Sequence, residues 1–382
     1  MDGVVQSILI GGTDLRVIER QVGGRPVRVA LRGAWPFDDA AFADALARVI
    51  AAGNAWMGAD ATSYFVPMIP LTGAETGAIS SGGTGRTGGF ALASTSNVDF
   101  DDIVRLLAHE YGHRWFGGSL GPTADPGAPE YWFTEGFGDF AAARTLVGGG
   151  LWTEADYAAH LNQVLLRYHS SSARTAPNAA LAERFWDDPA AMQMPYDRGH
   201  LFALALDRAE PGSVRAALLL MAREPEIFAA EETQAARFIR AYGAGPGRFD
   251  AMLAGEPIVL PADLFAACGT LEWAEQPIYA TGYTTAQDAD GRYFASVEET
   301  SPAWAAGLRP GMRYIRRVSF GPGDATVPFV MRVRDADGER VLQWLPEGPT
   351  RVRFQRLVLA DFTDAAARDA CRAQMGGQSA GR

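Results

Sequence analysis

The sequence predicts an α+β fold, and three features of its 382 residues predict it. The first third of the chain contains stretches that alternate apolar and polar residues, as strands do. The middle third repeats apolar residues at helical spacing, and the last third returns to short strands separated by turns. At 382 residues the chain is long enough for two or three domains, and its 48% hydrophobic residues are enough to give each domain a core.

The first elements are predicted as a hairpin, a helix and a strand. Residues 14–20 and 27–32 alternate in polarity around the turn Gly23-Gly24. Residues 39–52 have the apolar spacing of a helix, and residues 64–70 read as a further strand. We expect residues 73–89, which are rich in Gly, Ser and Thr, to form a loop. This stretch lacks the G-K-[ST] ending of a phosphate-binding loop.

The segment HEYGH, residues 109–113, has the residue types of a metallopeptidase centre. His109 and His113 are four residues apart, so on a helix they lie one turn apart and can bind one metal ion. Glu110 then lies beside the metal, where it can accept a proton from an activated water molecule. Acidic residues at 99, 101 and 102 precede an apolar helical face, which favours a capped and buried helix.

A catalytic zinc usually has a third protein ligand. Glu135 is the natural candidate, 22 positions after His113 in the segment WFTEGFGDF. We expect Thr134 to cap a helix from residue 135 to 146. We expect Gly136, which has no side chain, to leave space near the metal. Asp139 falls on the same helix face, four residues after Glu135, and can orient a ligand histidine from behind.

The alternative is a chance motif, because HExxH also occurs on ordinary helices. The acid-capped helix, the aromatic WFGG that follows the motif and the W-F-x-E-G segment favour the metal site. The remaining histidines are expected to be surface or packing residues rather than ligands: His160, His169 and His200.

The rest of the chain is organised by its turn residues. Residues 153–242 read as helices, Gly243 as their stop and residues 243–247 as a linker. Five strands follow, with a hairpin turn at residues 335–338 and a final helix with a frayed tail from Ala366. These strands are predicted at residues 293–298, 313–319, 327–334, 340–345 and 350–357.

HEYGHRWFGG and WFTEGFGDF together resemble the gluzincin aminopeptidases, whose third zinc ligand is the Glu of a W-x-x-E-G segment. Among them the chain most resembles the glycyl aminopeptidase family over residues 60–357. The resemblance implies a thermolysin-like catalytic domain, a helical domain, a PDZ domain and one Zn²⁺ per chain. SPAWAAGLRPGMRYI, residues 301–315, is similar to a PDZ helix and its following strand.

The resemblance also implies a role for Tyr196. The segment PYDRGHLFALALD is similar to the Tyr-x-Lys-Gly segment whose tyrosine stabilises the tetrahedral intermediate. A phenol can donate a hydrogen bond to an oxyanion without carrying charge itself. Tyr196 follows Pro195 and is expected at the entrance of an apolar helix. Arg198 replaces the usual lysine and changes the geometry of that charge.

The chain departs from the family at the substrate strand, which there ends in a glutamate that holds the free amine of the substrate. The matching stretch is expected at residues 88–95, where no acid is present. Gly88, Gly89 and Phe90 are still expected to form an exposed edge that pairs with a peptide. Glu75 or Glu130 would then have to supply the amine anchor from a loop.

The expected domains are a reduced N-terminal segment (1–60), a catalytic domain (61–150), a helical domain (151–262) and a PDZ-like domain (270–360). The long β-sandwich that begins other members is absent or reduced. The usual carboxylate loop of a PDZ domain is not recognisable, and residues 281–284 are its nearest candidate. We therefore expect a structural or substrate-guiding role, with a peptide as a possible ligand.

A formal net charge of −11 argues against nucleic acid or an anionic membrane as a partner, and no apolar run has membrane-spanning length. The N-terminus lacks a secretory signal, which favours the cytoplasm, or the periplasm or secretion if the chain is truncated. Cys268 and Cys371 can form one disulfide in an oxidising compartment or remain reduced.

Three functions follow from these observations. The first is a zinc aminopeptidase for small N-terminal residues acting on peptides or proteins. The second is a zinc endopeptidase or other amide hydrolase with the same centre, because the amine anchor is missing. The third is a PDZ-type binding protein with a vestigial zinc site, against which the intact set of catalytic residues argues.

Overall fold

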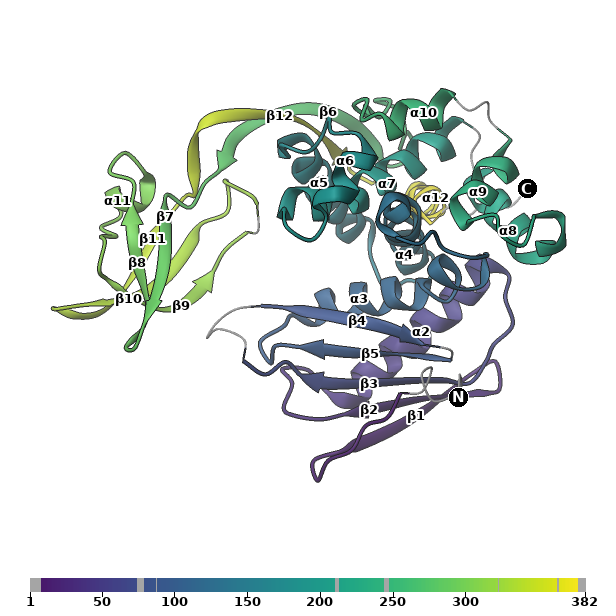
Figure 1. Cartoon of the computed structure of the whole chain (residues 1–382), viewed down its shortest axis with the longest axis horizontal. Coiled ribbons are helices and arrows are strands. Elements are labelled where there is room, and N and C mark those ends of the chain that lie inside the picture. The colour runs from purple at the N-terminus through teal and green to yellow at the C-terminus, as the bar shows by residue number, and fades with distance from the viewer. Residues whose placement is uncertain are drawn as a thin grey trace.

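The computed structural model describes residues 8–73, 79–86, 88–209, 213–243, 247–321, 323–362 and 364–376. Figure 1 shows an N-terminal sheet with helices against it, a cluster of helices, and a second sheet reached over a long two-stranded ribbon. The architecture is mixed α/β, in agreement with the class that the sequence predicts.

The N-terminal sheet has the strand order β1-β2-β3-β5-β4. β1 and β2 form the predicted hairpin, and Gly23 and Gly24 both adopt positive φ in its turn. β2, β3 and β5 run parallel, whereas β4 is antiparallel to β5. The bounds are β1 Arg16–Val22, β2 Arg25–Leu31, β3 Tyr64–Pro70, β4 Ser81–Arg86 and β5 Gly89–Ser94.

Helices α2 (Asp39–Met57) and α3 (Phe100–Gly112) pack against this sheet. The side chain of Asp38 caps α2 by accepting from the backbone amides of residues 40 and 41. α2 runs beyond the predicted end at residue 52 and stops at Gly58, which adopts the left-handed conformation. β1 and β2 lie in the same sheet as β3, and α2 shares its apolar core, so the described residues 8–60 pack as one unit with the sheet that leads into α3.

The predicted loop at residues 73–89 contains a strand, which corrects the sequence analysis. β4 pairs with β5 along its full length and forms the edge of the sheet, next to the helices in Figure 1. β5 lies between β3 and β4 and is therefore an inner strand, not the expected edge. The sequence hides β4 because SGGTGR has neither apolar alternation nor β-branched enrichment.

The helical region follows the π-helical turn η3 (Trp132–Phe137). α7 contains Pro195 in its interior, so Tyr196 lies within this helix and not at its entrance. Gly243 ends α9 in the left-handed conformation, as predicted, while residues 244–246 of the expected linker lie outside the described residues. The helices are α4 Gly138–Gly148, α5 Glu154–Ser170, α6 Asn178–Arg184, α7 Pro189–Ala209, α8 Ser213–Arg223, α9 Gln234–Tyr242 and α10 Gly247–Leu253.

The C-terminal strands form two sheets. β6 (Gly269–Tyr279) and β12 (Glu347–Leu359) make the antiparallel ribbon, and β12 packs against α5. Along the chain, β6 and β12 are separated by a meander with the strand order β11-β10-β9-β8-β7, which has its own apolar core. Asp335 pairs with Gly338 in the predicted hairpin turn. The remaining bounds are β7 Tyr283–Asp288, β8 Gly291–Val297, α11 Pro302–Ala305, β9 Arg313–Ser319, β10 Phe329–Asp335 and β11 Gly338–Trp344.

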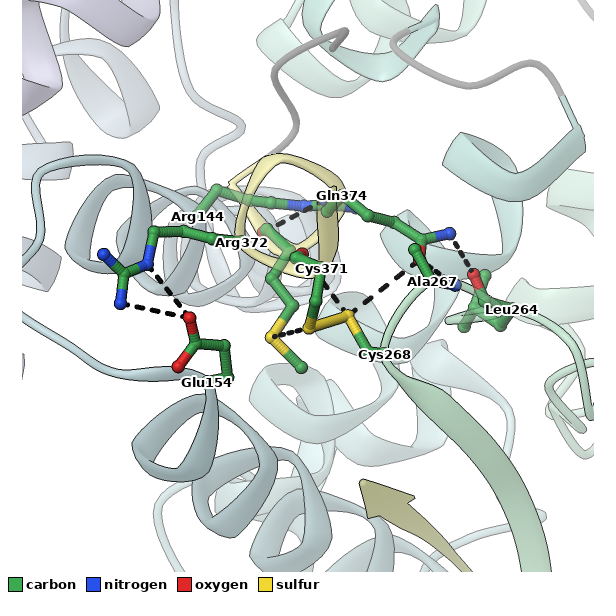
Figure 2. Close-up of a disulfide and its surroundings, with 9 residues drawn as sticks. Arg144, Glu154, Leu264, Ala267, Cys268, Cys371, Arg372 and Gln374 are labelled. Carbon is green, nitrogen blue, oxygen red and sulfur yellow. Dashed lines mark hydrogen bonds and ion pairs between the residues drawn. A yellow bond between two sulfur atoms is a disulfide. The ribbon is translucent and has the colours of Figure 1, made fainter. Parts of the chain in front are cut away.

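The final helix, α12 (Ala365–Met375), returns to the helical region and packs against α4 and α5. A disulfide joins Cys371 of α12 to Cys268, just before β6 (Figure 2). Arg144 of α4 donates to the carbonyl of Gln374, and Arg372 forms an ion pair with Glu154 at 3.0 Å. Across the described ranges, no helix combines the length and the apolar character that crossing a bilayer requires.

Candidate metal centre

α3 carries HEYGH in a conformation that local sequence determines. The Asp99 carboxylate accepts from the backbone amide of Asp101 and so caps the helix, as expected. Ile103 and Leu107 are fully buried beneath it. His109 lies in the last turn, and His113 is the residue that ends the helix in a right-handed conformation. Both imidazoles therefore project from the same end of one buried helix.

The ligand atoms of His109, His113 and Glu135 converge, all within 4.8 Å of one another. The two Nε2 atoms are 3.2 Å apart, and each lies close to the Oε2 atom of Glu135, at 3.3 Å from His109 and 3.5 Å from His113. Ligands at zinc bond lengths in a tetrahedron are separated by roughly 3.3 Å. The three side chains fit a zinc ion with one coordination position left open.

Glu135 reaches this position on η3 rather than on a Thr134-capped helix. The helical path begins at Trp132 without a side-chain cap, and Thr134 is buried, which corrects the expected start at residue 135. A Cβ on Gly136 would lie 2.5 Å from the Cα of Gly199 and 2.7 Å from the carbonyl oxygen of Pro195. Gly136 is therefore needed for close contact between η3 and α7, which brings Glu135 and Tyr196 together.

Asp139 lies behind His109, as the sequence analysis expects. Its Oδ1 atom accepts from Nδ1 of His109 at 2.8 Å, which turns Nε2 toward Glu135. Burial disfavours the charged imidazole, yet Asp139 and Glu135 raise the pKa of His109 to about 10. The negative charges of Asp139 and Glu135 thus favour a positive charge at this position, and a bound cation would supply one.

Glu110 differs from the other carboxylates of the centre. Burial raises its pKa above the ordinary value, although the neighbouring histidines oppose this effect. Glu135 shows the opposite shift, because hydrogen bonds from His109 and His113 outweigh burial and lower its pKa to about 2. Glu110 therefore holds a proton more readily than Glu135, as a proton-transfer group should.

Tyr196 stands beside the same centre. Its ring lies 6.1 Å from that of His109, centroid to centroid, in a stacked arrangement. Burial and the nearby Glu135 and Asp139 raise the pKa of its hydroxyl above the usual value, so it remains a protonated donor. Arg198, by contrast, points away from the centre: it is fully buried and donates to Asn178 and to the carbonyls of Arg174 and Ala176.

The free edge strand β4 crosses directly over Glu110. A Cβ on Gly83 would lie 2.5 Å from both carboxylate oxygens of Glu110, so this position must be glycine if Glu110 is to keep its place. The crossing separates two cavities that share Glu110 in their walls. Glu110 is thus reached from both sides along β4.

The first cavity, here called the arginine chamber, has a volume of about 620 Å³ and is lined by Gly85, Arg86, His113 and Arg114 among others. The second, the tyrosine chamber, has a volume of about 450 Å³. It holds Tyr196, the Ser81–Gly83 segment and the exposed carboxylate of Asp102. Sequence reasoning missed Gly83, Arg86 and Arg114, because no motif marks β4 as the strand beside Glu110.

The residues expected to bind substrate are only partly at the site. Gly88 lines the arginine chamber, but Gly89 and Phe90 are buried in the sheet and line neither chamber. Glu130 also lies outside both linings and accepts from the Thr233 hydroxyl at 2.7 Å. Glu75 lies outside the residues that the structure describes.

The three other histidines lie away from the converging ligand atoms. Burial lowers the pKa of His169 and of His200 to about 4, and His169 packs against Trp273. His160 contacts the ring of His200 and lines the tyrosine chamber. Within the described part of the chain, the one group of His, Cys, Asp or Glu side chains with metal-binding geometry is His109, His113 and Glu135.

Comparison with known proteins agrees with this geometry. Residues 102–194 match the family model of the M61 glycyl aminopeptidases. No curated protein sequence matches the chain. An aminopeptidase N family protein from Idiomarina loihiensis superposes with a TM-score of 0.62 at 16% identity, covering 95% of this chain and 70% of its own.

An M1 zinc metallopeptidase from Deinococcus radiodurans gives a TM-score of 0.44 at 20% identity, covering 65% of this chain and 52% of its own. The chain thus spans about half the length of that enzyme. The family match confirms the resemblance to glycyl aminopeptidases and covers both the HEYGH helix and Tyr131–Phe140. Over residues 102–194 the chain is therefore similar to peptidases of the glycyl aminopeptidase family.

Proposed function

We propose that this chain is a zinc-dependent peptidase that removes small residues from the N-terminus of peptides. The observation that carries the proposal is the convergence of His109, His113 and Glu135 on one point, with Glu110 beside it under the free edge of β4. When bound, zinc supplies a Lewis acid that polarises the substrate carbonyl and activates water.

The protein groups around this point have separate tasks. Glu110 accepts the proton of the attacking water and passes it to the leaving amine, a role suited to its raised pKa. Tyr196 donates a hydrogen bond from its protonated hydroxyl to the oxyanion. Asp139 keeps the Nδ1 proton on His109, so that Nε2 remains free to bind the metal.

The exposed edge of β4 offers backbone groups to an extended peptide. An unpaired strand edge binds such a segment by adding it as a further strand, and glycines at 82, 83 and 85 let its backbone approach closely. Substrate would then lie across Glu110 with its two sides in the two chambers. This assigns to β4 the role that the sequence analysis gave to residues 88–95.

The recognition of a free amine has two candidate carboxylates. Glu75 remains the candidate from the sequence, and Asp102 in the tyrosine chamber is an exposed acid with no ion pair among the described residues. The endopeptidase alternative is favoured by β4 itself, which carries no acid between Ser81 and Arg86. Peptides with free and acetylated N-termini separate the two: equal rates for both favour the endopeptidase.

The β7–β11 meander is proposed to be PDZ-like and to guide peptides or support the fold. Its own core, its one-turn helix α11 and Gly282 with positive φ before β7 support this assignment. In Figure 1 the meander stands apart from α3, the helix of the HEYGH segment, so its contribution would be to substrate capture rather than to chemistry.

Two variants test the proposed chemistry separately from metal binding. The purified chain should hold about one zinc ion, and His113→Ala should lose tight binding. Glu110→Gln should keep its zinc yet turn over unblocked peptides at least roughly a hundredfold more slowly, because it removes a base and not a ligand. Full metal content in His113→Ala would contradict the ligand assignment, and full activity in Glu110→Gln would contradict the role of Glu110 as the base.

A further inference from the structure

The arginine chamber combines two unneutralised positive charges with direct access to the proposed centre. Arg86 and Arg114 both line it, and Glu110 is the one carboxylate in its described lining. The chain as a whole carries a formal net charge of −11, whereas this cavity is lined by two arginines and is locally positive. The following inference rests on the proposed peptidase function and concerns which substrates it accepts.

Arg114 is held in place without being neutralised. Its Nη1 donates to Asn54 Oδ1 and to the Tyr111 hydroxyl, both at 3.0 Å, and its Nη2 donates to the backbone carbonyl of Asp60 at 3.3 Å. All three acceptors are neutral groups. They orient the guanidinium at the end of α3, and its full charge remains available to a ligand.

Arg86 ends the edge strand β4 on the same chamber. Its Nη1 donates to the Gly85 carbonyl at 2.6 Å and to the Thr84 hydroxyl at 3.0 Å, again neutral acceptors. Neither arginine has a carboxylate oxygen within ion-pair distance among the described residues. By contrast, four arginines in or next to the β1–β2 hairpin each contact a carboxylate at 2.5–2.8 Å: Arg16, Arg20, Arg28 and Arg32.

Two such guanidiniums repel an ammonium group and attract a carboxylate. A guanidinium offers paired N–H donors that match a carboxylate, and the chamber is bordered by Gly85, Gly117 and Gly118, which leave room for one. Because Glu110 and His113 line the same chamber, a group bound there lies close to the scissile bond. One residue of extended peptide spans roughly 3.3–3.6 Å, so the group belongs to a residue near the cleaved bond.

We propose that the arginine chamber binds a carboxylate of the peptide substrate through Arg86 and Arg114. The carboxylate is either the C-terminus of a short peptide or an acidic side chain near the scissile bond. The enzyme would thereby prefer very short peptides in the first case and acidic sequences in the second. Both place the specificity of the enzyme at the end of β4 and in the residues that directly follow α3.

Four peptides distinguish these sources. Gly-Ala-Ala and its C-terminal amide differ in the terminal carboxylate alone, and amidated Gly-Glu-Ala and Gly-Gln-Ala differ in the side chain alone. The zinc-loaded protein at low salt should favour the charged member of at least one pair by about three- to tenfold in kcat/KM, mainly through KM. High salt should reduce the preference, because the chamber is open to solvent.

The variants Arg86→Gln and Arg114→Gln should each lower this preference, whereas Arg114→Lys should keep part of it. Arg25→Gln is the matched control, since Arg25 is an exposed arginine of the same sheet that lines neither chamber. Arg86→Gln is the variant expected to fold normally, because Arg86 is exposed and its hydrogen bonds to described residues stay within its own strand. The preference of the control should equal that of the unchanged protein.

The proposal is overturned if the unchanged protein prefers neither charged peptide, or if the preference survives in both glutamine variants. Failure of the proposed function is recognised separately, by a zinc-loaded protein that cleaves none of the four peptides. In that case the dissociation constants of the same peptides, measured by calorimetry on each variant, still decide the inference. Equal affinities for charged and neutral members would refute it without any turnover.

Discussion

At the scale of single residues, the pKa values of three carboxylates within one centre are shifted in opposite directions. Burial raises that of Glu110, while histidine contacts lower those of Glu135 and Asp139. This division suits a proton carrier, a metal ligand and an orienting group in that order. It arises because Glu135 and Asp139 touch imidazole nitrogens and Glu110 does not.

The contact of Asp139 with His109 gives a prediction about zinc affinity. Asp139→Asn keeps the size of the side chain but removes the charge that holds the Nδ1 proton, so zinc affinity should fall roughly ten- to a hundredfold. Competition with a zinc chelator at fixed pH measures the change. Asp101→Asn, on the exposed first turn of the same helix, is the control and should leave the affinity unaltered. Equal affinities in the two variants would contradict the orienting role.

The closeness of the HEYGH side chains to one another can be predicted from the sequence for a physical reason. His109, Glu110 and His113 share one helix, where spacing alone determines relative position. Tyr196 was reached through resemblance, because a tyrosine in an apolar helix carries no signal of its own. Arg86 and Arg114 were missed: their proximity depends on how β4 and α3 pack, which the spacing of residues does not record.

At the scale of elements, the closeness of β4 to α3 decides what can occupy the centre. The edge strand of the sheet contacts the HEYGH helix, and a Cβ on Gly83 would lie 2.5 Å from the carboxylate oxygens of Glu110. Glycine-rich β4 was expected to be a loop because strand prediction depends on side-chain patterns. Pairing with β5 along its whole length fixes β4 without such side chains.

This approach predicts a selective effect of Gly83→Ala. The added methyl group would meet the Glu110 carboxylate, which lies at the end of a flexible side chain and can move aside. The melting temperature should therefore change little, whereas kcat should fall by about tenfold or more because the base is displaced. Gly11→Ala is the control, since nothing lies within 4 Å of a Cβ there and Gly11 lines neither chamber. Equal kcat values in the two variants would argue against the crossing as a constraint on Glu110.

In α7 the sequence analysis made a different error, because it relied on the usual preference of proline for the first turn of a helix. Proline usually begins a helix, so Tyr196 was expected at an entrance, but Pro195 lies inside α7. A Cβ on Gly199 would lie 2.8 Å from the Cα of Gly136 and would also meet the backbone of Trp132. Tertiary contact between glycines thus positions Tyr196, and such contact is not visible from local sequence.

At the scale of the whole molecule, the last described helix, α12, packs against the helices that begin the helical region. The β6–β12 ribbon carries the chain out to the β7–β11 meander and back, after which α12 packs on α4 and α5 (Figure 1). The sequence predicted most strands of this meander and, at residues 350–357, strand β12 of the ribbon, but it missed β6. The pairing of β12 with β6 was therefore not predicted, and the whole meander separates these two strands along the chain. Separation along the chain also left the pairing of Cys268 with Cys371 open.

The disulfide predicts how stability responds to reducing agents. It closes a span of 103 residues, and a cross-link of that length lowers the entropy of the unfolded chain by the equivalent of about 4–5 kcal/mol at most. The double variant Cys268→Ser/Cys371→Ser should therefore unfold at a lower denaturant concentration than the oxidised protein. Under reducing conditions the two should become nearly equal in stability.

The same comparison separates the disulfide from the packing of α12. Arg144 and Glu154 hold this helix by contacts that do not involve sulfur, so the helix should stay docked in the serine variant. Protection of the α12 amides from hydrogen exchange measures this directly, and peptide cleavage should persist because the bond lies outside both chambers. Equal stability of oxidised protein and serine variant, or loss of α12 protection on reduction alone, would show that this account of the C-terminal closure is wrong.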